Sequence, residues 1–396
     1  MSEFDPYSRA VLYVVHYAEI GLKGRNRPQF ESGLVDNLKR ALAPLAECRV
    51  SRVFGRILLK LPEHVNEDRV AAALNTVFGV AYFSRASTCE TNLDAIKALV
   101  DEFLGERNFR TFGVRARRPE KALPLRSSEI AIELGTHIQE RTGAKVDLSH
   151  PDLWIELHAM NQQTILIHEK QPGPGGMPVG TGGRAVALIS GGIDSPVAAL
   201  SLLRRGVTVR YVHFHSAPFT DTRSQDKVRD LVRRLAVFQG PADLHLVPFG
   251  PLQQRLVAEA PASPRVVLYR RFMLRIAESI ARRHGARALI TGDSVAQVAS
   301  QTIGNLDSIN RAATLPVLRP LIGMDKAEII ERAQALETYA ISIEPDQDCC
   351  SYLMPRRPST STRPEDLKRI EATLPVDDMV LEAVRATERE RIEPKA

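Results

Sequence analysis

AVALISGGIDSPVAALSLLRRG, residues 185–206, decides how the C-terminal half of this chain folds. The small and β-branched residues from 185 to 189 are typical of a buried strand, which then breaks off at a Ser-Gly-Gly turn. A second apolar run, of helical character, begins at Val197, directly after Pro196, a residue well suited to the first helical position. The stretch therefore predicts a strand, a glycine turn and a helix.

The turn has the chemical groups of a phosphate-binding loop. Ser190 and Ser195 supply hydroxyls, and the glycines between them can adopt positive φ and bring backbone N–H groups close to an anion. We expect Ser195 to cap the helix, so that its free N–H groups point into the turn. The lysine of a Walker A loop is absent, which argues against kinase-like transfer of a γ-phosphate.

The loop also matches the pattern of an enzyme class. Ser-Gly-Gly-x-Asp-Ser, here residues 190–195, resembles the pyrophosphate loop of ATP pyrophosphatases, which adenylate a carbonyl oxygen and release pyrophosphate. An ordinary strand-to-helix turn is the alternative interpretation. The position of the loop between a buried strand and a helix that opens with proline favours the pyrophosphate loop.

Length and composition limit the class of protein. With 396 residues, of which 44% are hydrophobic and 25% charged, we expect a cytoplasmic globular protein of two or three domains. No run approaches the roughly 20 apolar residues of a membrane span, and the N-terminus lacks the apolar core of a secretory signal. A net charge of +6 permits a polyanionic partner. The cysteines are too few and too irregularly spaced for a disulfide framework, and none forms a zinc-type pair, so we assign no metal-ligating residues.

Two small units that mix helices and strands are predicted upstream of the loop. Each carries a basic segment, one in a loop after the first strand and one after a strand over residues 111–117. These cations are either simply solvated or bind the phosphates of a nucleic acid. A stretch rich in proline and glycine over residues 171–184 predicts a linker to the C-terminal part. The candidate RNA contacts are Lys23, Arg25, Arg27, Arg115, Arg117 and Arg118.

Beyond the linker, strands and helices alternate, which predicts a doubly wound parallel sheet. Such sheets bind ligands at the carboxyl ends of their strands, so the Ser-Gly-Gly loop, His213-Phe214 and residues 291–294 should line one pocket. A D-x-x-E capping pattern over residues 325–328 opens a further helix. Lys326, in its first turn, is either a surface residue or is held there to meet phosphate.

Four blocks of sequence together indicate a family. They are GLKGRNRPQFE from residue 21, SGGIDSPV from residue 190, RPLIGMDKAEII from residue 319 and EPDQDCCSYLMPRRPSTSTRPEDL from residue 344. In this order, across essentially the whole chain, they are similar to the tRNA 4-thiouridine synthase family called ThiI. The resemblance implies an ATP-dependent tRNA sulfurtransferase that adenylates the uridine 4-oxygen and then transfers sulfur to it.

The resemblance also implies the architecture, an α/β chain of three domains. An N-terminal ferredoxin-like α+β domain would span residues 1–64, and an RNA-binding THUMP domain residues 65–170. After the linker, a doubly wound parallel-sheet pyrophosphatase-loop domain would span residues 185–396. The first two domains would bind tRNA, two copies would form a homodimer, and the reaction would use ATP and Mg²⁺.

Individual residues acquire expected roles from the same resemblance. Asp194 resembles the family's essential loop acid, needed for adenylation and for placing Mg²⁺, and Lys326 matches a lysine that assists the same step. The residues expected to bind ATP are Leu188, Ile189, Ser190, Gly191, Gly192, Asp194, Ser195, His213, Phe214, Arg270, Gly292 and Gln301.

The paired cysteines also gain a role from the resemblance. AMP attached to the uracil oxygen turns a poor leaving group into a good one, which a sulfur nucleophile can replace. Cys349 aligns with the family's persulfide-carrying cysteine, and Cys350 is a neighbour that some members have. Arg356 and Arg357 would lower a thiol pKa if they fold towards it. The alternative is that both cysteines are buried and inert.

The chain ends at Ala396, with a polar, helix-like tail and no room for the rhodanese domain of longer family members. We therefore expect sulfur to arrive directly from a cysteine desulfurase, and we do not expect the family's thiazole-synthesis role. The thiol that resolves the persulfide or disulfide stays open between Cys350, Cys89, Cys48 and an external thiol.

Two other functions compete with tRNA sulfurtransfer. An amidoligase with the same loop would adenylate a small acid and use ammonia, with no need of Cys349 or RNA. A non-catalytic RNA-binding protein that keeps the nucleotide fold would release no AMP. The two basic N-terminal units argue against the first, and the intact loop argues against the second.

Overall fold

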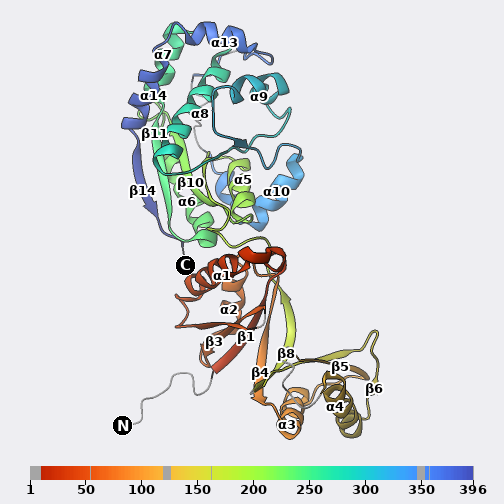
Figure 1. Ribbon diagram of the computed structural model, residues 1–396. Coiled ribbons are helices and arrows are strands. Elements are labelled where there is room, and N and C mark those ends of the chain that lie inside the picture. The colour runs from red at the N-terminus through yellow and green to blue at the C-terminus, as the bar shows by residue number, and fades with distance from the viewer. Residues whose placement is uncertain are drawn as a thin grey trace, which may run out of the picture. The chain divides into compact units, whose positions relative to one another are not determined.

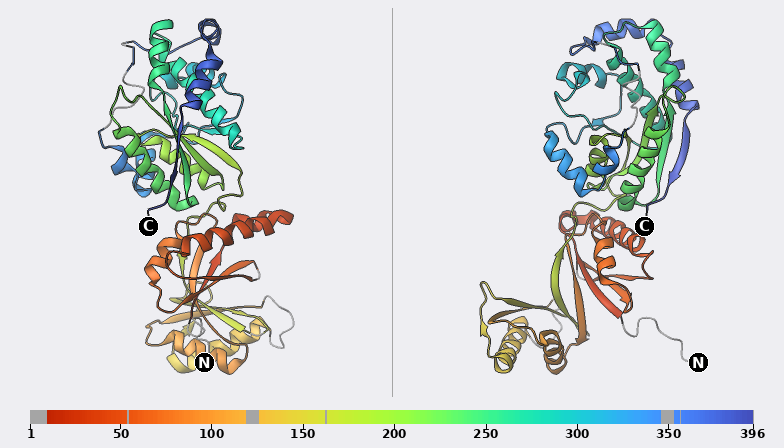
Figure 2. Two further views of the ribbon diagram at one scale, coloured as in Figure 1. Left: turned by 90° about the vertical axis from the view of Figure 1, so that its left-hand side faces the viewer. Right: turned by 180° about the vertical axis from the view of Figure 1, so that it is seen from behind.

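The computed structural model describes residues 10–53, 55–118, 126–161, 163–345, 353–355 and 357–395. Cys349, Cys350 and Arg356 lie outside these ranges. The chain forms two compact units, Met1–Gly176 and Met177–Ala396, called unit 1 and unit 2 below (Figure 1, Figure 2).

Unit 1 is built on one continuous eight-stranded sheet in the order β2-β3-β1-β4-β8-β7-β5-β6. Its strands are β1 (Ala10–His16), β2 (Arg49–Val53), β3 (Arg56–Pro62), β4 (Tyr82–Glu90), β5 (Thr111–Arg117), β6 (Lys145–Val146), β7 (Leu153–Ala159) and β8 (Gln163–Pro172). Its helices are η1 (Glu19–Leu22), η2 (Gly24–Asn26), α1 (Arg27–Leu42), α2 (Glu67–Leu74), α3 (Leu93–Leu104) and α4 (Ser127–Thr142).

Local sequence explains where the helices of unit 1 begin. The side-chain oxygen of Asn66 accepts the Arg69 N–H at 3.0 Å at the start of α2, and the side chain of Asn92 caps α3 in the same way. Strand β4 pairs with both β1 and β8, so the two small units expected from the sequence share one sheet. The boundary placed between residues 64 and 65 falls between β3 and α2 and stays a prediction.

Unit 2 contains a six-stranded sheet in the order β13-β12-β9-β10-β11-β14. Its strands are β9 (Arg184–Leu188), β10 (Thr208–His215), β11 (Ala242–Pro248), β12 (Leu289–Ile290), β13 (Val317–Leu318) and β14 (Glu388–Ile392). Its helices are α5 (Asp194–Leu203), α6 (Arg223–Gln239), α7 (Gly250–Glu259), α8 (Arg265–Arg283), η3 (Ala299–Gln301), α9 (Ile303–Asn310), α10 (Lys326–Ala335), α11 (Tyr339–Ser342), α13 (Pro364–Glu371) and α14 (Val376–Arg385).

The helices of unit 2 cover both faces of its sheet. Strands β9 to β13 pair in parallel, and alternate residues of a strand point to opposite faces. Val186, Val212 and Phe214 pack in one core with residues of α8. Helices α5 and α6 follow β9 and β10 in the chain and pack against β9, β10 and β11. The expected doubly wound arrangement is therefore confirmed.

The end of the chain differs from the helix-like tail expected from sequence. After α13 and α14, strand β14 pairs antiparallel with β11 at the edge of the sheet. Its sequence, ERERI, has almost no apolar residue, and ion pairs hold it in place of hydrophobic packing. Glu390 binds Arg229 at 2.7 Å, and Asp243, which is buried, binds Arg389 at 2.9 Å. A strand held by ion pairs shows no hydrophobic periodicity in its sequence, which is why the sequence did not predict β14.

A buried ion pair fixes α13 to the central helix α8. Arg271, which is 3% exposed, donates two hydrogen bonds of 2.7 Å to the Glu371 carboxylate. Arg275 donates two more. Burial alone would raise the pKa of Glu371, but the bonds and charges of the two guanidinium groups outweigh it and lower the pKa to about 2. Within the described residues, no helix has the length and apolar character needed to cross a membrane.

Replacing Glu371 by Gln should lower the free energy of unfolding by about 3 kcal/mol, because a buried guanidinium loses its carboxylate. Urea unfolding followed by circular dichroism at neutral pH measures this. Glu365→Gln, which alters an exposed acid on the same helix, is the matched control and should change stability by less than about 0.5 kcal/mol. Equal effects of the two substitutions would show that the buried pair does not stabilise α13.

Candidate active site and nucleic-acid interface

A cavity of about 360 Å³ opens at the carboxyl ends of β9, β10 and β12. The chain leaves β9 for β10 on one side, whereas β12 pairs with the other side of β9, so this is the point where the strand order reverses. Ligands bind open α/β sheets at such points. All residues expected to bind ATP line the cavity, with the exception of Gly191 and Gly192 in the loop. The three strand ends that the sequence placed in one pocket are therefore brought together.

The loop is closed by its two serines. The Ser195 hydroxyl accepts the Ser190 N–H at 2.9 Å and lies 3.2 Å from the Ser190 carbonyl oxygen, to which it donates. The expectation that Ser195 caps the helix was wrong, because α5 begins at Asp194 and its N-cap residue makes no side-chain cap. The hydroxyl is used to shape the loop instead. Among the described residues, no N-cap side chain binds the start of α5, so its first backbone N–H groups are available to an anion.

Close packing explains the glycine that follows β12. A Cβ on Gly292 would lie 2.8 Å from the backbone nitrogen of Ser195 and 3.0 Å from the carbonyl carbon of Asp194. Both contacts are with backbone, which cannot move aside without distorting the loop. Only glycine therefore lets residues 291–294 lie directly against the start of α5.

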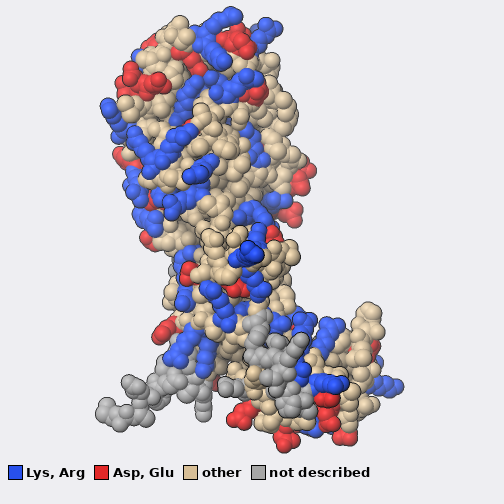
Figure 3. Space-filling model, in the orientation of Figure 1, with Lys and Arg blue, Asp and Glu red and all other residues tan. Residues whose placement is uncertain are grey.

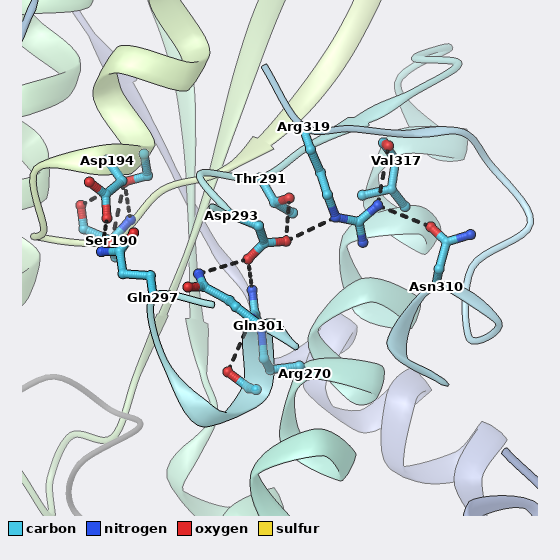
Figure 4. Close-up of polar contacts among 12 residues, drawn as sticks. Ser190, Asp194, Arg270, Thr291, Asp293, Gln297, Gln301, Asn310, Val317 and Arg319 are labelled. Atoms are coloured by element: carbon cyan, nitrogen blue, oxygen red, sulfur yellow. Dashed lines mark hydrogen bonds and ion pairs between the residues drawn. The ribbon is translucent and has the colours of Figure 1, made fainter. Parts of the chain in front are cut away.

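Asp194 is held by side chains from two other segments, of which Figure 4 labels Gln297. Lys326 Nζ lies 2.6 Å from Asp194 Oδ1, and the Gln297 side-chain amide donates to Asp194 Oδ2 at 3.0 Å. The capping box predicted for α10 is present, so Lys326 is the first residue of a well-defined helix. Lys326 is thus not simply a surface residue, because it contacts the acid of the loop.

Gln297 was missed by reasoning from sequence alone. It lies 103 residues from Asp194 in the chain, and no spacing rule connects the two. The preceding Ala296 has φ of 64°, a left-handed conformation that costs a non-glycine residue roughly 1–2 kcal/mol. Hydrogen bonds hold this turn, including one of 3.0 Å from the Ala296 N–H to the Gln301 carbonyl oxygen. A strained, well-anchored turn therefore delivers the Gln297 amide to the loop.

Asp293 organises the opposite wall of the cavity; the sequence placed residues 291–294 in the pocket but gave Asp293 no role of its own. Arg270 binds one of its carboxylate oxygens, and Arg319 Nε and the Thr291 hydroxyl donate to the other at 3.1 and 2.7 Å. Burial alone would raise the pKa of Asp293, but the charge and hydrogen bond of Arg270, with help from Thr291 and Arg319, lower it to about 2. Its fixed negative charge holds two guanidinium groups beside the cavity.

This wall leaves two buried polar atoms for a ligand. Gln301 donates to Asp293 through its amide nitrogen, but its Oε1 has no partner among the described residues. Arg319 Nη2 likewise has no hydrogen-bond partner within the described part of the chain. Buried polar atoms are usually hydrogen-bonded, so one acceptor and one donor remain unused beside the cavity.

Described residues on both sides of the segment that carries the paired cysteines lie near the cavity. On its N-terminal side, the Ser342 hydroxyl donates to the Gly192 carbonyl oxygen at 3.4 Å. On its C-terminal side, Met354 and Pro358 line the cavity. The described residues before and after this segment therefore both lie at the candidate site.

The other two cysteines lie in unit 1 and are poor nucleophiles. Burial raises the pKa of the Cys48 thiol to about 11, against weaker opposing effects of Lys60 and Lys39. Burial and the neighbouring Glu90 raise the pKa of Cys89 to about 11 as well. Because the thiolate is the reactive form, both thiols should react more slowly near neutral pH than an ordinary cysteine does.

Two of the three basic residues near η2 have partners within unit 1. Lys23 Nζ lies over the Phe30 ring, 5.1 Å from the ring centre. Arg27 binds Glu31 at 2.8 Å and donates to the Tyr17 hydroxyl at 2.6 Å. Arg25 is exposed on η2.

The second basic segment lies at the end of β5. Arg115 and Arg117 are exposed and share one face of the strand, and Arg118 follows it half-buried. Figure 3 shows lysine and arginine side chains close to one another on the visible face of unit 1. The RNA-contact role of all six residues stays a prediction.

Comparison with known families matches three family models in chain order. The ThiI ferredoxin-like domain matches residues 12–84, the THUMP domain residues 90–169 and "Thiamine biosynthesis protein (ThiI)" residues 180–376. The chain is 45% identical to a "Probable tRNA sulfurtransferase" of Thermus thermophilus, covering 96% of this chain and 93% of that one. The chain belongs to the ThiI family. The ferredoxin-like, THUMP and pyrophosphatase-loop fold expected from the sequence is thereby confirmed.

Further comparisons extend over nearly the whole of this ThiI-family chain. A "Probable tRNA sulfurtransferase" of Moorella thermoacetica is 42% identical, with 97% of this chain and 98% of that one covered. A crystal structure of a 4-thiouridine synthetase–RNA complex with bound ATP is 39% identical, with 97% and 100% coverage and a TM-score of 0.87. In the described part of the chain, no three His, Cys, Asp or Glu side chains group as a metal site.

Asp293→Asn should destabilise this ThiI-family protein at neutral pH. The difference in free energy of unfolding between the variant and the wild type should become smaller in acid. The Asp293 pKa is lowered from 3.8 to about 2 on folding, so the carboxylate stabilises the fold fully above about pH 4. That contribution is lost as the pH falls towards about 2. The difference in free energy of unfolding should fall by about 2 kcal/mol between pH 5 and roughly pH 2. Urea unfolding across this range measures it, and a constant difference would contradict the assignment.

Proposed function

We propose that this chain is a tRNA uracil 4-sulfurtransferase, which uses ATP to convert uridine to 4-thiouridine. The observation that carries the proposal is Asp194, placed in a pyrophosphate loop at the switch-point cavity and contacted there by Lys326 and Gln297. Support also comes from the THUMP domain and from relatives named tRNA sulfurtransferase.

The loop suits the phosphates of ATP. Free N–H groups at the start of α5, the Ser190 hydroxyl and Lys326 offer donors and positive charge to an anion. Asp194 is an oxygen ligand of the kind that Mg²⁺ takes together with substrate phosphates, so the donor set fits the ion. Bound there, Mg²⁺ would neutralise charge that develops on the departing pyrophosphate. The Gln301 side-chain oxygen, which has no partner among the described residues, would orient the nucleoside.

The proposed reaction has two stages. The uridine 4-oxygen attacks the α-phosphorus of ATP, and pyrophosphate leaves with the electrons of the broken bond. The terminal sulfur of a persulfide on Cys349 then attacks carbon 4 of the base, and AMP leaves with the former 4-oxygen. A second thiolate attacks the Cys349 sulfur and releases 4-thiouridine, which leaves a disulfide for an external thiol to reduce.

The candidates for the thiol that resolves the persulfide can be reduced in number. Cys48 and Cys89 have pKa values near 11 and are therefore poor candidates. Cys350 or an external thiol remains for this step. A cysteine desulfurase as sulfur donor, a homodimer and a cytoplasmic location stay predictions from the family resemblance.

Gln297 acts in this scheme as a positioning residue. Its amide binds one Asp194 oxygen while Lys326 binds the other, so the two contacts orient the carboxylate at the loop. Fixing a charged group in the reactive geometry lowers the reorganisation needed in the transition state. Loss of the amide should therefore slow adenylation more than it weakens ATP binding.

Cys349→Ala should bind ATP and tRNA but transfer no sulfur, whereas Asp194→Ala should already fail at adenylation. The assay combines unmodified tRNA, Mg-ATP, a cysteine desulfurase and cysteine, and follows nucleoside composition and AMP together. Cys48→Ala and Cys89→Ala are matched controls and should keep full transfer. Normal thiolation by Cys349→Ala would overturn the persulfide role, and AMP formed only with a small acid and ammonia would replace the function by that of an amidoligase.

Gln297→Ala should lower the rate of pyrophosphate release by roughly tenfold and change the ATP dissociation constant by less than about twofold. Single-turnover release with tRNA and equilibrium ATP binding give the two values. Val295→Ala, an exposed residue of the same turn, is the control and should behave as the wild type. A weakening of ATP binding as large as the loss of rate would show that Gln297 binds the nucleotide and does not position Asp194.

A further inference from the structure

The THUMP part of unit 1 contains an arginine stacked on the chain's only tryptophan. Strands β5 and β7 are parallel, and Gly113 is paired with Trp154. A Cβ on Gly113 would lie 2.5 Å from Cζ3 of Trp154, so the indole crosses the neighbouring strand only because this residue is glycine. It then reaches Arg115, two residues further along the same face, whose guanidinium carbon is 3.4 Å from the ring centre.

This geometry fixes the orientation of the arginine. A separation of 3.4 Å is van der Waals contact, which a guanidinium reaches only when its plane lies flat on the ring. Arg115 is nevertheless exposed and, among the described residues, makes no ion pair. One flat face is covered by the indole, while the side chain as a whole stays accessible to solvent. The pair is thus planar, cationic and accessible.

We propose that Arg115, supported by Trp154, is a stacking platform for an unpaired nucleobase of the bound RNA. Bases splayed out of RNA stack on aromatic rings and on guanidinium planes, and arginine adds a cation–π contribution. The exposed Arg117 on the same face and Arg118 beyond it supply charge for the flanking phosphates. The inference rests on the proposed function in that the RNA is its tRNA substrate, and it assigns to Arg115 a contact with a base in addition to phosphate.

The test compares two RNA probes that carry equal charge. One is a single-stranded oligonucleotide of eight nucleotides, and the other has the same backbone with every base removed. The full-length protein should bind the base-bearing RNA about tenfold more tightly. Arg115→Lys keeps the charge but loses the plane, so it should lose most of this preference while the dependence of affinity on salt stays unchanged.

Arg110→Lys is the matched control, because Arg110 is an exposed arginine beside the same strand and contacts no aromatic ring among the described residues. It should keep the preference for the base-bearing RNA. Fluorescence of Trp154, the only tryptophan, gives a second readout and should change with the base-bearing RNA but not with the abasic one. Equal wild-type affinity for the two RNAs, or equal losses in the two lysine variants, would overturn the proposal.

Failure of this inference can be told from failure of the proposed function. If the wild type makes 4-thiouridine but does not distinguish the two probes, the enzyme assignment stands and the stacking platform is wrong. If it prefers the base-bearing RNA through Arg115 but makes no 4-thiouridine, the platform stands and the reaction assignment is wrong.

Discussion

The candidate site depends on the close approach of two backbone segments. Gly292 lies so near the start of α5 that any Cβ would collide with the backbone of Asp194 and Ser195. This contact joins the loop after β9 to the segment after β12 at the point where the strand order reverses. The cavity, the acid of the loop and the arginine-lined wall all take their positions from it.

The two carboxylates at this contact are held in different ways. Asp293 is almost fully buried, bound by Arg270 and Arg319, and ionised down to a pH of about 2. Asp194 is partly exposed and bound by the flexible side chain of Lys326 and the amide of Gln297. A buried carboxylate bound by two arginines is part of the scaffold, because separating them would leave its buried charge unpaired. A carboxylate whose partners are accessible can exchange them for a substrate and its metal ion.

Unit 1 also positions arginine side chains through contacts with neighbouring residues, but for a different purpose. Its eight strands form one sheet, so the ferredoxin-like and THUMP parts share a framework. Arginines on this framework are either used internally, as Arg27 is by Glu31 and Tyr17, or presented outward. The indole of Trp154 keeps Arg115 flat and outward although no carboxylate binds it within the described residues. Counting basic residues in the sequence cannot separate these cases, because the partners come from distant strands.

By itself, the sequence determined the class of fold, the loop and the three strand ends that line the cavity. Periodicity and the Ser-Gly-Gly loop specify a strand, a turn and a helix, which are local properties, and parallel strands place their carboxyl ends together. The tertiary structure alone decided that Ser195 shapes the loop, that Gln297 reaches Asp194 and that Asp293 anchors two arginines. It also decided that the charged end of the chain is a strand. Each of these depends on hydrogen bonds or ion pairs between residues that lie apart in the chain, and such contacts leave no periodic pattern in the sequence.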